Sequence, residues 1–289
     1  MSLVQIAPAT ETLIRVFPER NKWTPSDDLA FVGHPPFEQF RPADPFTPVH
    51  VSVTFTWHRK IARELADAWS VYYRNVSVGG PAYDDPGGEF FPGWYLKAGS
   101  TITSRGCPKR CGWCKVPFSE GALRELPIKP GWIVQDNNLL ACSERHLCAV
   151  FDMLREQKRN IFFNGGLDKH YLRPWHRKLF DSIAVGELWF ACDQAGDMAA
   201  LEKARLIMDG YPQRKMRCYT MIGYDEETLK EAEKRIERVF QMGFLPFSQL
   251  YQPPTADMPT KSYGDDWKAV NKQWCRPAAM PWASLTEGR

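Results

Sequence analysis

Residues 96–114 read LKAGSTITSRGCPKRCGWC, and the fold prediction starts from them. Residues 96–103 have the composition of a strand, and the loop that follows contains Cys107, Cys111 and Cys114 at the spacing C-x3-C-x2-C. Thiolates are soft ligands, and a tight loop can direct three of them at one compact metal group. Three cysteines fill three corners of a [4Fe–4S] cube and leave one iron open for a non-protein ligand. The sequence therefore predicts an iron–sulfur site at the end of this strand.

Strand and helix patterns alternate downstream of the cysteine loop. Six strands are expected, at residues 96–103, 132–135, 161–163, 188–191, 216–222 and 246–251. Helical periodicity lies between several of them, with Ser143, Asp197 and Asp225 as the expected N-caps of three helices. This alternation indicates an α/β fold with a parallel sheet, which right-handed crossovers would curl into a full or partial barrel. Functional groups are then expected where the strands end.

Three regions are expected along the chain. Residues 1–95 form an N-terminal extension, in which a strand at 49–55, a helix at 58–70 and a strand at 75–78 give a Rossmann-like unit. Residues 96–256 form the core. Residues 257–289, which contain Trp267, Trp274 and Trp282, are expected to be a tail that packs back on that core.

Composition excludes several classes of protein. The chain has 289 residues, of which 44% are apolar and 25% charged, as in a globular protein long enough to bury its own core. It contains no run of about 18 apolar residues, and Met1 to Thr12 lack the pattern of a secretory signal, so no membrane association is expected. With eight cysteines and no export signal, a cytoplasmic location is expected, where clustered cysteines more often bind metal than form disulfides.

The cysteine spacing, the aromatic Trp113 before the last cysteine and the position after the first strand of a (β/α) series resemble the radical S-adenosylmethionine superfamily. The resemblance covers about residues 96–252. It implies a partial (β/α)6 barrel and a [4Fe–4S] cluster on Cys107, Cys111 and Cys114, whose open iron chelates S-adenosylmethionine. It further implies reductive cleavage to a 5′-deoxyadenosyl radical that abstracts hydrogen from a substrate. An external one-electron reductant of the flavodoxin or ferredoxin type is the implied partner.

The ends of the later strands supply the residues expected to hold S-adenosylmethionine. These are Asp136, Asn137, Asn164, Gly165, Asp193, Ile222 and Gly223. By the resemblance, Asp136 and Asn137 replace a Gly-Gly-Glu stretch that contacts the methionine amino group. Asp193 is the candidate for the ribose hydroxyls, and Ile222-Gly223 resembles the stretch that flanks adenine. An ordinary strand-end loop or helix cap is the alternative at each position.

The N-terminal strand–helix–strand unit resembles a shrunken cobalamin-binding domain. The signature Asp-x-His-x-x-Gly is absent, and His50 and His58 lie outside such a context. Cobalamin is therefore not predicted, and the unit is interpreted as a structural remnant or a cap that faces the substrate.

Two basic segments flank the predicted barrel mouth. Residues 105–129 hold six Lys and Arg against two Glu, and residues 155–178 hold seven against Glu156 and Asp168. Such segments attract phosphates or nucleic acid, whereas the net charge of +3 also fits a merely solvated surface. The candidate substrate-binding residues are Arg105, Asp168, Lys169 and His170. A modified nucleobase or nucleic acid is the favoured substrate, and a small metabolite is the alternative.

A non-catalytic function is the rival class. In that class the cysteines bind zinc, with Cys142, His146 or Cys148 as a fourth ligand, or a redox cluster, and the chain is a nucleic-acid-binding or electron-transfer module. Zinc sites prefer two separated cysteine pairs, which this spacing does not provide. Cys275, between Trp274 and Arg276, is a further candidate near the substrate, although single cysteines are more often structural.

Overall fold

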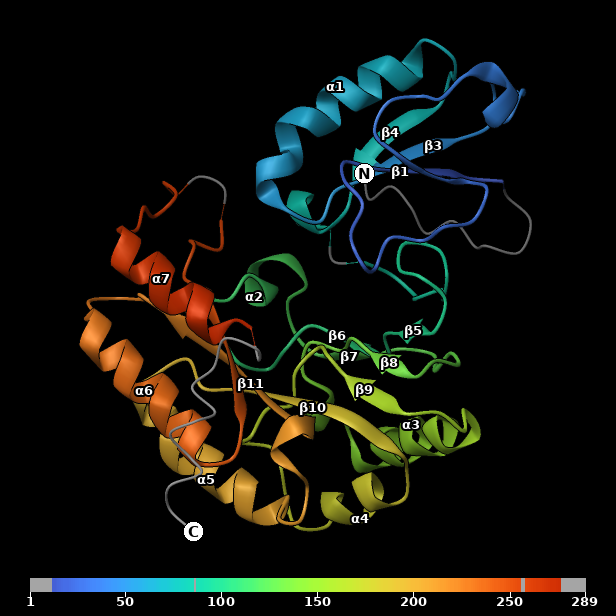
Figure 1. Cartoon of the computed structure of the whole chain (residues 1–289). Helices are drawn as coiled ribbons and strands as arrows, with labels where there is room; N and C mark the ends of the chain where they lie inside the picture. The colour runs from blue at the N-terminus through green and yellow to red at the C-terminus, as the bar shows by residue number, and fades with distance from the viewer. Residues whose placement is uncertain (1–11, 86, 256–257, 277–289) are drawn as a thin grey trace.

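Two parallel sheets organise the computed structural model, which describes residues 12–85, 87–255 and 258–276 (Figure 1). The smaller sheet has the strand order β2-β1-β3-β4 and belongs to the N-terminal region. The larger sheet has the order β12-β11-β10-β9-β8-β5. The predicted α/β class with parallel strands is therefore confirmed.

The N-terminal sheet consists of β1 (Ile14–Phe17), β2 (Ala30–Val32), β3 (Val49–Ser52) and β4 (Val76–Gly79). Helix α1 (Arg59–Ser70) connects β3 to β4 and buries Leu65 and Trp69 in a cluster with the valines of β3. The predicted strands at 49–55 and 75–78 and the helix at 58–70 are confirmed. Strands β1 and β2 were not predicted, because each is only three or four residues long and is stabilised by pairing with distant segments.

The larger sheet consists of β5 (Ser100–Thr101), β8 (Ile133–Val134), β9 (Ile161–Phe163), β10 (Val185–Ala191), β11 (Met216–Ile222) and β12 (Leu245–Leu250). Each strand predicted downstream of residue 95 has its counterpart here. The strands lie in space in the order in which they occur in the sequence. Strands β5 and β12 form the two edges, so within the described residues the sheet is open. Strands β6 (Ser104–Arg105) and β7 (Arg124–Glu125) form a separate antiparallel pair.

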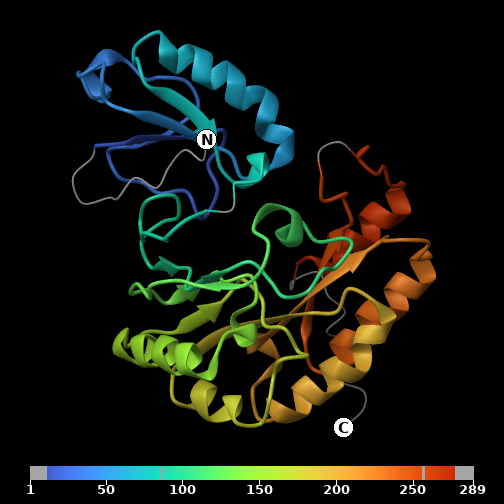
Figure 2. The ribbon, with the colours of Figure 1, turned by 180° about the vertical axis from the view of Figure 1, so that it is seen from behind.

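Helices follow one another along the outside of the larger sheet (Figures 1 and 2). They are α3 (Glu144–Glu156), α4 (His176–Asp181), α5 (Met198–Ile207) and α6 (Leu229–Gln241). Helix α2 (Val116–Ser119) follows the cysteine loop, and α7 (Asp265–Trp274) contacts β12. Short 3-10 helices occupy Glu38–Phe40, Thr56–His58, Pro81–Tyr83, Leu139–Ala141, Ala195–Asp197 and Gln213–Lys215. In the ranges that the structure describes, no helix has the length and apolar character to cross a membrane.

Two of the three predicted N-cap positions are confirmed, Ser143 for α3 and Asp197 for α5. The Ser143 hydroxyl accepts a hydrogen bond from the His146 N–H at 3.2 Å at the start of α3. Helix α6 is capped instead by Thr228, whose hydroxyl and the Glu231 carboxylate form a capping box, so the prediction for Asp225 was wrong. Asp197 occupies the N-cap position of α5, as predicted, but its carboxylate accepts from the Asp193 and Gln194 N–H groups and makes no cap hydrogen bond to α5. An Asp before an apolar run predicts a helix start only to within a few residues.

The main core lies between the larger sheet and its helices. Phe151, Phe163 and Phe180 are fully buried there, with ring centroids 5.2–5.8 Å apart. A second cluster joins the tail to the body, because Val270 and Trp274 of α7 are buried with residues of α6 and β11. Trp267 packs against this cluster, and Trp282 lies outside the described residues.

Candidate metal centre

The three cysteines lie on the loop between β6 and α2, which leaves the carboxyl end of the larger sheet. Gly106 has a φ of +76°, and a Cβ there would clash with the carbonyl oxygen of Ala122. The Cys107 N–H donates to Gly121 O at 3.1 Å, and the Cys114 N–H donates to Cys111 O at 3.0 Å. These backbone hydrogen bonds fold the segment from Cys107 to Cys114 into a tight loop that carries all three cysteines.

The three thiols of the loop affect one another's pKa. All eight cysteines are free, and these three are partly exposed. Burial raises the pKa of Cys114 to about 11, and the nearby Cys111 and Cys107 raise it further. Burial also raises the pKa of Cys111, while the ammonium of Lys109 lowers it. Three thiolates in this position would repel one another, so a cationic metal group would release their protons and stabilise them.

Within the described ranges, no group of three or more His, Cys, Asp or Glu side chains is arranged to hold a metal ion. A four-iron cluster differs from a single ion in this respect, because each thiolate binds its own iron and the donors are spread apart. Three thiols on one short loop are therefore the donor set that such a cluster needs, and they are not the closed tetrahedral set of a structural zinc site.

Hydrogen bonds connect the cysteine loop to the ends of β8 and β9. The Asn138 Nδ2 lies 3.3 Å from the Cys107 sulfur and donates to Asp168 Oδ2 at 3.1 Å. Asp168 also accepts from the Lys109 ammonium, with an N···O distance of 3.1 Å. Asn138 is 2% exposed, and its Oδ1 is buried with no hydrogen-bond partner among the described residues. Asp168, expected to bind substrate, thus anchors the loop, together with Asn138 and Lys109, which were not predicted as site residues.

Glu120 is a second anchor that the sequence did not reveal. Its Oε2 accepts from the Gly106 N–H at 3.1 Å and from the Asn137 Nδ2 at 2.6 Å, and its Oε1 lies 3.5 Å from the Arg105 guanidinium. Asn137 was expected to bind cofactor and Arg105 to bind substrate. In the structure both side chains contact Glu120, immediately beside the cysteine loop.

Asp136 and Gly165 are enclosed by protein. Asp136 is 1% exposed, and its carboxylate accepts from the Thr103 N–H, the Thr103 hydroxyl and the Ser104 hydroxyl at 2.7–2.8 Å. Burial raises the pKa of Asp136, whereas these hydrogen bonds lower it. A Cβ on Gly165 would clash with the Asp136 carbonyl oxygen. Both residues therefore connect neighbouring strand ends, and neither is exposed to a cofactor.

Asn164 and Asp193 retain acceptor capacity at the ends of β9 and β10. The Asn164 Oδ1 is buried and has no hydrogen-bond partner in the part of the chain that the structure describes. Asp193 accepts from the Met221 N–H at 3.1 Å through Oδ1. Burial is the main cause that raises the pKa of Cys111 and Cys114, and the negative charge of Asp193 adds to it. These are the two predicted cofactor residues that fit a ligand with N–H or O–H donors.

The end of β11 is covered by the segment that precedes α7. Ile222 is fully buried, and a Cβ on Gly223 would clash with the Tyr263 ring. The Gly223 carbonyl accepts from the Lys261 ammonium at 2.6 Å. Neither Ile222 nor Gly223 is thus open to an adenine in this structure. The next residue, Tyr224, reaches the cysteine loop instead, because its ring centroid lies 5.1 Å from that of Trp113.

Lys169 and His170 both contact Asp197. The Lys169 ammonium lies 2.9 Å from Asp197 Oδ1 and its side chain is 6% exposed, while the His170 Nε2 lies 3.3 Å from the same oxygen. These two candidates for substrate binding therefore join the loops after β9 and β10.

The remaining cysteine and histidine candidates are dispersed. Cys142 is buried, His146 lies 3.8 Å from the Glu125 carboxylate, and Cys148 is exposed on α3. Cys275 follows the end of α7 and its sulfur lies 3.5 Å from the Lys272 carbonyl oxygen.

The face of the sheet opposite the helices carries polar and aromatic side chains that the sequence did not single out. The Arg217 guanidinium donates to the Glu187 carboxylate at 3.0 Å, and the ring centroids of Trp189 and Tyr219 lie 4.4 Å apart. The Tyr219 hydroxyl donates to the Asn164 carbonyl at 3.0 Å. Since side chains alternate along a strand, these residues face away from the helices.

No protein-family model matches this chain, and no curated protein matches it. The functional assignment therefore depends on the cysteine loop, the strand ends around it and their chemistry.

Proposed function

We propose that the chain is an enzyme of the radical S-adenosylmethionine type that holds a [4Fe–4S] cluster on Cys107, Cys111 and Cys114. One observation carries the proposal: the C-x3-C-x2-C loop follows the first of six parallel strands that lie in space in sequence order. In barrels of alternating strands and helices, functional groups gather at this end of the sheet. The architecture proposed is a partial (β/α)6 barrel.

The residues around the loop support such a group. The Asn138 N–H is directed at the Cys107 sulfur, and although burial raises the pKa of Cys111, the Lys109 ammonium offsets part of that increase. When bound together, the cluster and S-adenosylmethionine supply a 5′-deoxyadenosyl radical that abstracts hydrogen from a substrate. Asn164 and Asp193 would bind the amino group and the hydroxyls of S-adenosylmethionine, because both present oxygen acceptors at strand ends.

The proposed partner is an external one-electron reductant of the flavodoxin or ferredoxin type. A reducing compartment, the cytoplasm, suits a chain whose eight cysteines are all free thiols.

The substrate class follows from how the basic residues are paired. Of the thirteen Lys and Arg side chains in residues 105–129 and 155–178, at least seven form ion pairs within the described part of the chain: Arg105, Lys109, Lys115, Lys129, Arg155, Lys169 and Arg177. Paired cations offer little to a phosphate backbone. A modified nucleobase or nucleoside is therefore proposed ahead of a long nucleic acid, with another small metabolite as the alternative.

Anaerobic reconstitution of the full chain with iron and sulfide tests the proposal. We expect about four irons per chain, and formation of 5′-deoxyadenosine from S-adenosylmethionine when dithionite is added. Cys111→Ala should abolish this cleavage, whereas the matched control Cys148→Ala removes an exposed thiol of α3 and should retain it. Thermal unfolding of both variants checks that the fold survives.

Two results would overturn the proposal. Stoichiometric zinc without cleavage would identify a non-catalytic zinc module. Iron and sulfide without cleavage of S-adenosylmethionine would identify an electron-transfer module.

A further inference from the structure

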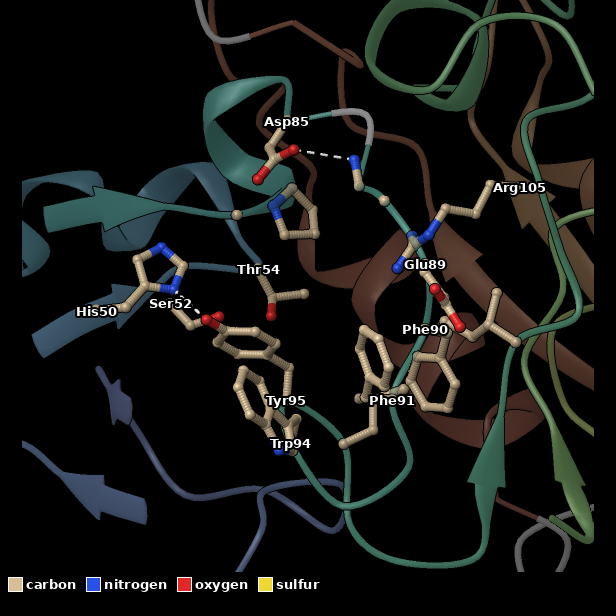
Figure 3. Close-up of a pocket in the computed structure, with 16 residues that line it drawn as sticks. His50, Ser52, Thr54, Asp85, Glu89, Phe90, Phe91, Trp94, Tyr95 and Arg105 are labelled. Carbon is tan, nitrogen blue, oxygen red and sulfur yellow. Dashed lines mark hydrogen bonds between the residues drawn. The ribbon is translucent and has the colours of Figure 1, made fainter. Parts of the chain in front are cut away.

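A cavity of about 460 Å³ lies at the carboxyl end of the N-terminal sheet (Figure 3). Ser52 and Thr54 come from the end of β3, and Gly80 and Pro81 follow β4. In open parallel sheets, ligands bind in the crevice outside the carboxyl ends of the strands. The volume falls within the range of about 300–1,000 Å³ that small-molecule sites occupy.

The cavity exists because a helix covers only one face of this sheet. Val49 and Val51 of β3 are buried against α1, so the alternate residues His50 and Ser52 point to the other face. Residues 87–97 cover that face without a helix. Several bonds hold them, among them those from the Arg15 guanidinium to the Trp94 carbonyl at 2.8 Å and between the His50 Nδ1 and the Tyr95 hydroxyl at 2.7 Å. The cavity wall is therefore fixed before any ligand binds.

One side of the cavity is aromatic. Phe90, Phe91, Trp94 and Tyr95 contribute rings to it, and Figure 3 shows the rings of Phe91 and Tyr95 on either side of the central space. Rings in this arrangement bind flat, unsaturated ligands by stacking, and they tolerate different substituents because every such ligand has a π-face.

Among the described residues, the polar side of the cavity presents the carboxylates of Asp85 and Glu89 and one cation, Arg105, which is ion-paired. Asp85 accepts the Gly87 N–H at 2.9 Å and forms no ion pair with any residue that the structure describes. Arg105 also lines the cavity: its guanidinium lies 3.5 Å from the Glu120 carboxylate, and its buried Nε has no hydrogen-bond partner among the described residues, while Glu89 is paired with Lys129 at 2.7 Å. Burial lowers the pKa of His50 to about 4, so its imidazole is neutral at physiological pH. A phosphate would meet the Asp85 carboxylate, and the charge of Arg105 is already offset by Glu120.

We propose that this cavity binds an unphosphorylated nucleoside or free nucleobase, with the ring against the aromatic wall and an N–H or O–H donor on the Asp85 carboxylate. Arg105 also lines the cavity and lies two residues before Cys107, so the cavity adjoins the start of the cysteine loop. The role of this ligand as the substrate rests on the proposed function, whereas its binding requires neither iron nor S-adenosylmethionine.

Calorimetric titration of the full-length Cys111→Ala chain without iron tests the binding. The probes are adenosine, guanosine, cytidine, uridine, their free bases and their 5′-monophosphates. We expect at least one nucleoside or base to bind, and its 5′-monophosphate to bind at least tenfold more weakly. Absence of binding by all nucleosides and bases, or equal affinity for the monophosphate, would overturn the inference.

Two further variants locate the binding. Asp85→Asn should weaken nucleoside binding at least tenfold. Phe91→Ala should also weaken this binding, and it tests the site even if Asp85→Asn folds poorly. Asp84→Asn is the matched control, because Asp84 pairs with Lys115 at 2.7 Å and does not line the cavity. Binding that both cavity variants leave unchanged would place the ligand elsewhere, such as the proposed S-adenosylmethionine site, and would refute this assignment.

The two proposals fail separately. Cleavage of S-adenosylmethionine by a chain that binds no nucleoside or base would refute only the cavity assignment. Nucleoside binding that depends on Asp85, in a chain that never cleaves S-adenosylmethionine, would refute only the radical function.

Discussion

The side-chain amide nitrogen of Asn138 lies 3.3 Å from the sulfur of Cys107, although the two residues belong to different strand ends. The same nitrogen donates to Asp168, which is paired with Lys109 of the cysteine loop. One buried amide therefore positions the first cysteine relative to β8 and β9. A hydrogen bond to a cysteine sulfur also stabilises the more negative, reduced state of an iron–sulfur cluster.

Asn138→Leu should therefore lower the reduction potential of the reconstituted cluster. We expect a shift of about 30–60 mV, which corresponds to roughly a three- to tenfold change in the one-electron equilibrium. Potentiometric titration followed by EPR measures it. Asn75→Leu removes an exposed amide in the N-terminal unit and should leave the potential unchanged. Equal potentials in all three proteins would show that the Asn138 N–H does not act on the cluster.

The Lys109–Asp168 ion pair should stabilise the folded loop. The two side chains are 33% and 11% exposed, so solvent screens the pair only in part. A double-mutant cycle of Lys109→Met and Asp168→Asn, followed by urea unfolding, should give a coupling free energy of about 0.5–1 kcal/mol. Additive effects of the two substitutions would mean that the contact contributes nothing.

Gly165→Ala should destabilise the fold strongly. The new methyl group would clash with the Asp136 backbone, and a strand end cannot move away without breaking the hydrogen bonds of Asp136. We expect the free energy of unfolding to fall by about 2 kcal/mol or more, the range of overpacked cores. Gly196→Ala is the control, since no atom lies within 4 Å of a Cβ there. Equal melting temperatures for the two variants would contradict the close approach seen at Gly165.

Two buried histidines should make the fold less stable at acidic pH. Burial lowers the pKa of both His50 and His176 from 6.5 to about 4. Between these values the unfolded chain binds a proton on each histidine that the folded chain does not, so the free energy of unfolding falls as the pH falls. For each histidine, the free energy of unfolding falls by at most about 1.4 kcal/mol per pH unit in this window. Above pH 6.5 both histidines are neutral in the folded and the unfolded chain, so this loss of stability is absent.

Replacement of His176 by Asn checks this pH dependence. The Asn side chain retains an acceptor for the Arg173 N–H but cannot be protonated. Urea unfolding at pH 4.5 and 6.5 should show a difference in stability smaller than in the original chain. An unchanged difference would mean that His176 is not buried as a neutral imidazole.

The larger sheet was predictable because its signals are local. Strand β11 and helix α6 each display their own periodicity, and the six strands were found from such patterns. Strands β1 and β2 lack this property, because Ile14–Phe17 and Ala30–Val32 are too short to show a period and depend on each other and on β3. The cap of α6 was misplaced for a related reason: Asp225 and Thr228 both suit a cap, and the backbone at Asp225, with a φ of +56°, cannot be the helix start.

The amino-acid sequence by itself determined the cysteine loop and the alternation of strands and helices. Both features can be found there because spacing and periodicity are properties of neighbouring residues. Tertiary structure alone decided which strand-end side chains face a ligand. Asp136 and Gly223 carry the right chemistry in the sequence, but Thr103 and Ser104 enclose the first and Tyr263 covers the second. It also placed Asn138 on Cys107 and opened the cavity beside Asp85. Whether a side chain is exposed to a ligand, and which residues it bonds to, depends on segments that lie far apart along the chain. Only folding brings those segments together.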